Sequence, residues 1–290
     1  MTIRHLRIFI AVHDELNMTV AANKLFMTQP AVSQAIKELE DYYGVLLFER
    51  LSRRLYVTES GEILYQYATH IIKLFDKLED NLKENAFQQE LTIGANYTVG
   101  VALVHKYIEE FKNLYSDAKI RVVVNRASIL IEMLRKNELD LALMEEVLNE
   151  SGLIEDYFSD DRIAIVAAPN HHLVAQKEVT AYDISNEPLL LREKGAGVRN
   201  LFEQRMNEMG LSIKPYWEST SATALINAAI NKLGIAVLPF LLVKEHIAAG
   251  RLKEIKVKDM DLSRKLTIVY HKNKFLTTAM QDFIRICHES

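Results

Sequence analysis

The chain has 290 residues, a net charge of −4 and a hydrophobic content of 49%. This length fits about two domains, and the composition excludes a disordered chain, which would be less apolar and more strongly charged. The longest apolar run, near residues 235–243, is shorter than the about 20 residues that a membrane span needs. The first residues contain no secretory signal, and the lone Cys287 excludes an intramolecular disulfide. We therefore expect a cytoplasmic protein without a membrane segment.

The chain divides into three parts by its hydrophobic pattern. Residues 1–58 are predicted to form a small helical domain ending in a hairpin, and residues 59–88 one long amphipathic helix. From residue 89 to 290 short apolar runs alternate with helical patterns, which is typical of βαβ units in a largely parallel sheet. The sequence therefore predicts an α/β protein overall. The runs expected to form strands are 91–95, 120–124, 139–144, 163–168, 189–191, 235–238 and 266–270.

The N-terminal segment predicts two short helices joined by a turn. Asn17 is a good N-cap for the first helix, and Pro30 suits the first turn of the second, which is expected to end at Gly44. This pattern is typical of a helix-turn-helix over about residues 18–37. The residues expected on the buried face of the second helix are Val32, Ile36, Leu39 and Tyr43.

The exposed side chains of this motif can bind DNA. Gln34 can form two hydrogen bonds with adenine in the major groove, and the free N–H groups at the helix start can hold a phosphate. Residues 47–58 predict a β-hairpin with arginines at its tip, which suits contacts with the DNA backbone or the minor groove. The alternative is a solvated face on a helical bundle, because Lys/Arg and Asp/Glu are equally numerous in residues 1–60. The candidate DNA-binding residues are Thr19, Thr28, Gln29, Pro30, Ser33, Gln34, Lys37, Arg50, Arg53 and Arg54.

Several short motifs occur in a fixed order through this region. They are Ala21-Ala22-Asn23-Lys24-Leu25, Thr28-Gln29-Pro30-Ala31-Val32-Ser33, Leu39-Glu40, Gly44-Val45-Leu46-Leu47-Phe48-Glu49-Arg50 and Thr58-Glu59-Ser60-Gly61. Their order and spacing resemble those of the LysR-type transcriptional regulators, over the whole chain and most specifically within residues 1–61. The resemblance implies a winged helix-turn-helix that binds double-stranded DNA, and contact with RNA polymerase.

The long helix carries an apolar seam. Thr58 suits its N-cap, and Glu59 and Glu62 favour the positive end of the helix. Apolar residues spaced alternately by three and four extend over about two heptads, on a helix with a length of roughly 39 Å. Such a helix needs a partner, and the alternative is packing against its own domain. The resemblance implies pairing of two such helices in a homodimer, and a dimer of dimers (homotetramer) through the C-terminal domains. The seam residues are Leu64, Tyr67, Ile71, Leu74 and Leu78.

The C-terminal part is similar to the effector-binding domain of the same family, which resembles the periplasmic solute-binding fold. The resemblance implies two α/β subdomains, one at about 91–161 with 267–290 and the other at about 162–266, with a ligand in the crevice between them. Hydroxyl groups, backbone N–H groups and arginines at several helix starts suit a small anion. The alternative for each of them is an ordinary helix cap. The candidate effector-binding residues are Asn96, Thr98, Ser128, Arg192, Gly197, Arg199, Ser219 and Thr220.

The remaining motifs of the sequence do not predict a metal site or a catalytic site. His171 and His172 have no carboxylate or cysteine at metal-ligand spacing, so no metal site is expected. Neither a catalytic constellation nor a cofactor motif is found, and we expect no enzyme. The sequence therefore predicts a sequence-specific transcriptional regulator modulated by a small anionic effector. The alternatives are a small-anion-binding module without DNA function and an enzyme acting on a small anion.

Overall fold

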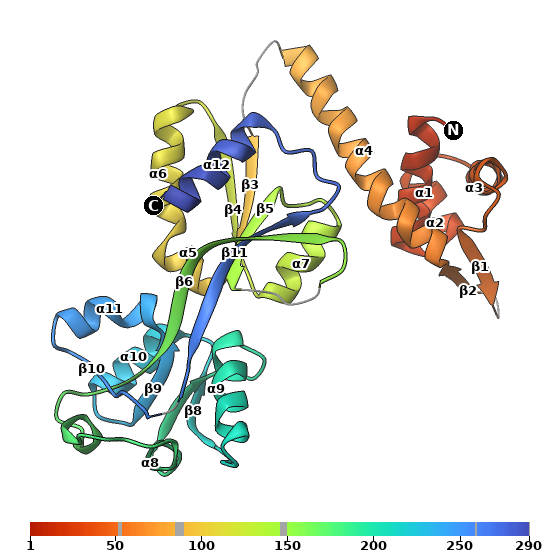
Figure 1. Cartoon of the computed structure of the whole chain (residues 1–290). Helices are drawn as coiled ribbons and strands as arrows, with labels where there is room; N and C mark the ends of the chain where they lie inside the picture. The colour runs from red at the N-terminus through yellow and green to blue at the C-terminus, as the bar shows by residue number, and fades with distance from the viewer. Residues whose placement is uncertain (52–53, 85–89, 146–149, 259, 290) are drawn as a thin grey trace.

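The computed structural model describes residues 1–51, 54–84, 90–145, 150–258 and 260–289. These residues form a helical N-terminal domain, a long helix and a C-terminal domain of two lobes (Figure 1). Within these ranges, no helix is both long enough and apolar enough to cross a lipid bilayer.

The N-terminal domain combines the predicted helix-turn-helix with a hairpin. Its elements are α1 (Ile3–Glu15), α2 (Met18–Lys24), α3 (Gln29–Tyr43), β1 (Phe48–Leu51) and β2 (Arg54–Val57). Apolar side chains from these helices and from the hairpin pack into one core, so the hairpin is held beside the helix-turn-helix.

Local sequence determines where α2 and α3 begin and end. Asn17 Oδ1 accepts hydrogen bonds from the backbone N–H groups of Thr19 at 2.9 Å and Val20 at 3.2 Å, as expected of an N-cap. Gly44 ends α3 with a φ of 69°, a left-handed conformation that costs glycine little. Both predicted signals are therefore confirmed.

The buried face of α3 is shorter than the sequence predicts. Val32, Ile36 and Leu39 are buried as expected, but Tyr43 is 44% exposed. Tyr43 lies in the last turn of α3, beyond the reach of the domain core. The prediction that Tyr43 is buried was wrong for this reason.

The long helix α4 (Glu59–Glu84) begins on the N-terminal domain. Thr58 Oγ1 accepts a hydrogen bond from Gly61 N at 3.0 Å, which confirms the predicted N-cap. Further along α4, Tyr65 is buried in the core of the N-terminal domain, and its hydroxyl donates a hydrogen bond to Asp14 Oδ1 at 2.8 Å. These contacts fix the direction in which α4 leaves the domain.

The two lobes of the C-terminal domain have separate apolar cores. Lobe 1 contains β3 (Glu90–Ala95), β4 (Lys119–Val124), β5 (Leu141–Glu145), α5 (Tyr97–Ala102), α6 (Val104–Leu114), α7 (Ala127–Arg135) and α12 (Thr278–Glu289). Lobe 2 contains β7 (Leu189–Arg192), β8 (Pro215–Ser219), β9 (Ile235–Pro239), β10 (Lys253–Glu254), the 3₁₀ helix η1 (His172–Ala175), α8 (Ala181–Ser185), α9 (Gly197–Glu208), α10 (Ala222–Ile230) and α11 (Phe240–Ala248).

Two long strands, β6 (Leu153–Ala167) and β11 (Ser263–His271), run side by side from one lobe to the other (Figure 1). The strand order is β4-β3-β5-β11-β6-β9-β7-β8, with β10 paired to β6. The pairs of β3 with β4 and β5, and of β7 with β8 and β9, are parallel. The pairs made by β6 and β11 are antiparallel. The expected largely parallel sheet is therefore interrupted at its centre.

Two strand predictions need correction. Strand β6 begins at Leu153 rather than near residue 163, because its first half is polar and gives no apolar run. Strand β8 was not predicted at all. It lies at the edge of the sheet, and its central residues Tyr216, Trp217 and Glu218 are exposed, so its sequence lacks the signature of a buried strand.

Candidate DNA interface and effector cleft

Two hollows on the N-terminal domain bring most candidate DNA-binding residues together. Arg50 on β1 lines both hollows, so the hairpin lies beside the recognition helix α3. The residue Arg53 lies outside the described residues. The candidates that line the hollows are Thr19, Gln29, Arg50 and Arg54 for one, and Ser33, Lys37 and Arg50 for the other.

The cations of this surface are free to meet phosphates. Among the residues that the structure describes, Lys37, Arg50 and Arg54 have no carboxylate partner. By contrast, Lys24 on α2 is paired with Glu15, with Nζ and Oε1 2.9 Å apart. Unpaired Lys and Arg side chains release counterions when they bind DNA, which supplies most of the sequence-independent affinity.

Gln34 lies exposed on α3 within a small polar network. Its Nε2 donates a hydrogen bond to Glu38 Oε1 at 3.0 Å, and Glu38 Oε2 lies 2.9 Å from His5 Nε2. These hydrogen bonds, from His5 first and Gln34 second, lower the pKa of Glu38. To contact a base edge, Gln34 has to give up its hydrogen bond to Glu38 and form hydrogen bonds with the base instead.

The start of α3 presents backbone donors as well. Thr28 is the N-cap residue and Pro30 follows in the first turn, and within the described ranges the Thr28 side chain makes no capping hydrogen bond. The N–H groups of the first turn are therefore available to a phosphate oxygen.

The predicted seam of α4 lies largely open in the single chain. Tyr67, Ile71, Leu74 and Leu78 are 47%, 42%, 49% and 53% exposed, whereas Leu64 packs against the core of the N-terminal domain. We call Tyr67, Ile71, Leu74 and Leu78 the α4 stripe. It is an apolar surface on an otherwise amphipathic helix.

A cavity of about 620 Å³ lies between the lobes, a volume typical of small-molecule sites. Six of the candidate effector-binding residues line it, and two do not. The six are Asn96, Thr98, Ser128, Arg192, Gly197 and Thr220.

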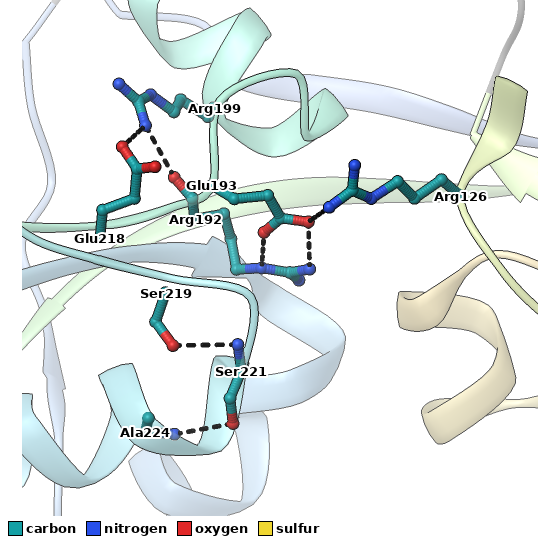
Figure 2. A network of polar contacts seen from close by, with 8 residues as sticks. All are labelled: Arg126, Arg192, Glu193, Arg199, Glu218, Ser219, Ser221 and Ala224. Carbon is teal, nitrogen blue, oxygen red and sulfur yellow. Dashed lines mark hydrogen bonds and ion pairs between the residues drawn. The ribbon is translucent and has the colours of Figure 1, made fainter.

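Arg199 does not line the cavity, because its charge is used inside lobe 2. The side chain is buried, and its guanidinium forms an ion pair with Glu218 (Figure 2) and another with Glu203. Arg199 Nη1 also donates a hydrogen bond to the carbonyl oxygen of Arg192 at 3.1 Å. Arg199 therefore supports the end of β7 and is not positioned as a counter-charge for a ligand.

Asn96 caps a helix start, which is the alternative that the sequence left open, and Ser219 forms a hydrogen bond in the turn just before another helix. Asn96 Oδ1 accepts a hydrogen bond from Val99 N at 2.9 Å at the start of α5. Ser219 Oγ, outside the cavity, accepts one from Ser221 N at 3.0 Å (Figure 2), and Ser221 caps α10. Neither polar group needs a ligand to be satisfied.

Two arginines from opposite lobes meet at one carboxylate in the cleft. Figure 2 shows Glu193 between Arg192 of lobe 2 and Arg126 of lobe 1. Arg192 Nε donates to Glu193 Oε2 at 2.9 Å, and Arg126 Nη2 lies 3.6 Å from Oε1. Burial acts to raise the pKa of Glu193, but the hydrogen bonds from Arg192 and the charges of both arginines outweigh it and lower the pKa. The pair between Arg126 and Glu193 connects the lobes.

Helices α7 and α9 begin at the cleft with free backbone donors. In the part of the chain that the structure describes, their N-cap residues Arg126 and Ala196 make no side-chain capping bond. Ser128 lies exposed in the first turn of α7, and Gly197 is the first residue of α9. The two helix starts come from different lobes and face the same cavity.

Glu145, at the end of β5, extends across the cleft to α9. A Cβ atom on Gly197 would lie 2.5 Å from Glu145 Oε1, so any larger residue at this position would force the Glu145 carboxylate to move. The other carboxylate oxygen, Oε2, is buried and has no hydrogen-bond partner among the described residues. Glu145 was not predicted from the sequence, because only the fold places the end of β5 opposite α9.

A winged helix-turn-helix with unpaired cations, joined by a long helix to a cleft between two lobes, defines a DNA-binding protein with a ligand-binding domain. Residues 3–62 match the model of the bacterial regulatory helix-turn-helix proteins of the lysR family, and residues 84–290 match that of the LysR substrate binding domain. The chain belongs to the LysR family of transcriptional regulators.

Individual relatives agree with this assignment along the whole chain. The HTH-type transcriptional regulator YwqM of Bacillus subtilis (strain 168) is 32% identical over 301 residues, covering 100% of this chain and 99% of YwqM. The regulator CysL of the same organism is 30% identical over 267 residues, covering 91% of this chain and 89% of CysL. These relatives are transcriptional regulators.

Solved structures share the fold. A full-length OxyR variant from Pseudomonas aeruginosa superposes with a TM-score of 0.65 at 22% identity, covering 100% of this chain and 94% of OxyR. HinK, a LysR family regulator from Pseudomonas aeruginosa, has a TM-score of 0.62 at 22% identity, covering 100% of this chain and 98% of HinK. The protein is thus a DNA-binding transcriptional regulator with a C-terminal effector-binding domain.

Proposed function

We propose that this regulator acts in the cytoplasm and responds to a small anionic effector bound in the cleft between its lobes. The observation that carries the proposal is the meeting of the uncapped starts of α7 and α9 at one cavity. Each helix start presents roughly half a positive charge and free N–H groups. Arg126 and Arg192 add two guanidinium groups at the same place.

The effector also carries a hydrogen-bond donor in this proposal. Glu145 Oε2 is buried in the cleft and has no hydrogen-bond partner among the residues that the structure describes, and an unmet acceptor of this kind costs about 1–3 kcal/mol. A hydroxyl or amino group on the ligand would satisfy it. Hydroxy acids and amino acids therefore fit the lining better than a bare inorganic anion.

Binding would change how the lobes are held together. An anion at the start of α7 competes with Glu193 for Arg126 and so replaces the direct cross-lobe ion pair. A ligand that favours one lobe separation shifts the population toward it. Because lobe 1 contacts α4 through Lys73 and Asn137, the shift would reach the DNA-binding domain.

The proposed regulator is a homodimer that buries the α4 stripe between two copies. The stripe is apolar and exposed in one chain, and its spacing suits pairing with an identical helix. Two DNA-binding domains on one dimer bind far more tightly than one, through effective concentration. Assembly into a dimer of dimers and contact with RNA polymerase complete the proposal.

A thermal-shift screen tests the effector site. Hydroxy acids, amino acids, sulfur oxyanions and phosphates are added to the wild type, Ser128→Ala and Arg192→Ala. A ligand that binds the folded state raises Tm, and each substitution should weaken its binding by about 1–3 kcal/mol. Arg121→Ala, at an exposed arginine of β4 outside the cavity, is the control. The proposal would be contradicted if the ligand with the largest Tm shift were cationic or wholly apolar. It would also be contradicted if that shift were the same in the wild type and in both variants.

A further inference from the structure

Lobe 2 carries a cluster of metal-ligating side chains outside the effector cleft. One ligand atom each from His171, His172 and Glu187 lie within 4.8 Å of one another. Glu187 Oε1 is 2.9 Å from His172 Nε2, and Glu187 Oε2 is 3.5 Å from His171 Nε2. No metal site was expected from the sequence, because no carboxylate or cysteine lies at metal-ligand spacing from the histidines. The fold supplies one from the segment between α8 and β7.

The core of lobe 2 holds these side chains in place. The histidines are next to Leu173, which is buried in that core, and the rings are stacked with centroids 4.6 Å apart. On the other side, Glu187 N donates a hydrogen bond to the carbonyl oxygen of the buried Ile184 at 3.2 Å. Both segments are therefore anchored independently of the cluster, and a ligand would meet an arrangement that already exists.

We propose that His171, His172 and Glu187 bind a divalent transition-metal ion such as Zn²⁺. In a tetrahedral zinc site, bonds of about 2.0–2.2 Å place neighbouring ligand atoms roughly 3.3 Å apart. The three ligand atoms lie within 4.8 Å of one another, and the distances of 2.9 and 3.5 Å run to different oxygens of Glu187. Side-chain rotations would bring one carboxylate oxygen and the two ring nitrogens to the spacing of a zinc site. Two imidazoles and one carboxylate are a frequent zinc donor set that leaves a position open to water.

The exposure of the cluster suits reversible binding from solution. The His171 and Glu187 side chains are 14% and 15% exposed, whereas His172 is 62% exposed. Zinc binds the neutral form of imidazole through the lone pair of a ring nitrogen. His171 Nδ1 accepts a long hydrogen bond of 3.4 Å from Leu173 N. Metal binding at Nε2 moves the ring proton to Nδ1 and gives up this weak bond.

The bound ion would join η1 to the segment that leads into β7. We expect it to stabilise lobe 2 against thermal unfolding, because it binds the folded arrangement only. The DNA-binding surface and the lining residues of the effector cleft do not include the three ligands. Effector and metal should therefore bind without competing for a side chain.

The test uses the full chain, without an affinity tag, after treatment with EDTA and dialysis. Binding of Co²⁺ is followed by its visible absorption, which is intense for tetrahedral coordination, and Zn²⁺ affinity is measured by competition with a chromophoric chelator. The variants are His172→Ala and Glu187→Gln. The control is His288→Ala, which removes a histidine that lies 3.1 Å from Asp156 and that, within the described ranges, belongs to no group of three possible ligands.

We expect the wild type and His288→Ala to bind about one equivalent of metal and to gain Tm. His172→Ala and Glu187→Gln should each lose at least about tenfold in affinity. His172 is exposed enough that its substitution leaves the fold intact, which circular dichroism verifies. Wild-type protein without saturable Zn²⁺ binding would overturn the proposal, and so would equal affinity in the wild type and His172→Ala.

Discussion

Lys73 of the linker helix α4 donates a hydrogen bond to the carbonyl oxygen of Asn137 in lobe 1, with Nζ and O 2.7 Å apart. Lys73 Nζ also lies 3.7 Å from Asp140 Oδ1, which forms a closer ion pair with Lys274 at 2.8 Å. Asp140 is therefore the centre of a charge cluster that holds α4 to the effector-binding domain. These contacts connect the linker helix to the effector-binding domain in addition to the chain itself.

Replacing Asp140 by Asn should destabilise the protein by about 3–5 kcal/mol at pH 7, because it removes the carboxylate charge paired with the largely buried Lys274 side chain. Burial acts to raise the pKa of Asp140, but the charges of Lys274 and Lys73 outweigh it and lower the pKa. The stabilisation is therefore complete above the unfolded pKa, about 4, and is lost as the pH falls through the folded value. Denaturant unfolding between pH 3 and pH 7 measures this.

The exposed Asp117→Asn serves as the control for this experiment. We expect the stability difference between wild type and Asp140→Asn to narrow below about pH 4, while Asp117→Asn behaves as wild type throughout. A difference that stays constant as the pH falls would show that the Asp140 charge is not what stabilises the cluster.

Gln34→Ala should lower affinity for the cognate DNA site by about 1–3 kcal/mol and relax the preference at one base pair. The reason is the loss of a base contact that Gln34 makes after leaving Glu38. Fluorescence anisotropy with every base pair of the site varied in turn measures both effects. Gln204→Ala is a matched control, since Gln204 donates to Glu208 at 2.9 Å in the same way on α9. If Gln34→Ala lowered the affinity for cognate and random DNA equally, Gln34 would not contact a base.

Arg54→Ala should weaken cognate and random DNA alike and reduce the slope of log affinity against log salt by about one. Arg54 lines a hollow next to α2 and α3 and has no carboxylate partner in the described ranges. A salt titration of DNA binding measures the slope, and Arg121→Ala in lobe 1 should leave it unchanged. An unaltered slope in Arg54→Ala would place this hairpin strand away from the phosphates.

Ile71→Asp should dissociate the proposed dimer, because it would place a charge in the interface that we propose for the α4 stripe. Loss of the second DNA-binding domain should then reduce DNA affinity by about 100-fold or more. Light scattering at micromolar concentration measures the mass, and Ile71→Leu, which keeps the residue apolar, should remain dimeric. Ile71 is 42% exposed in one chain, so the substitution leaves the monomer folded. An Ile71→Asp protein that stays dimeric would exclude the stripe as the interface.

Local signals made the N-terminal part of the structure predictable. Asn17, Gly44 and Thr58 act within a few residues of their own positions, so their roles follow from sequence spacing alone. Leu64 shows the limit of the helical pattern. It lies at a seam position by spacing but packs on the N-terminal domain, because the direction of α4 is set by distant contacts such as that between Tyr65 and Asp14.

The effector cleft was less predictable because its charges are paired over long sequence distances. The sequence places Arg192 and Arg199 near the same helix start. Only the fold shows that Arg199 forms an ion pair with Glu218 and is therefore not available to a ligand. In the same way, Glu145 reaches Gly197 from the other lobe. Motifs locate helix starts well, whereas the partner of each charge depends on tertiary structure.

The ribbon formed by β6 and β11 determines how the lobes can move. Its hydrogen bonds continue from Ser263 opposite Arg162 to His271 opposite Leu153, with a shift in register between Leu266 and Thr267. Lobes joined in this way cannot swivel on loose tethers. Any closure has to bend the paired strands, and we expect the flexion to concentrate at the irregular register. We expect bending of the paired strands to cost elastic energy. This cost would limit how far the lobes move and would return them to their resting separation when the effector dissociates.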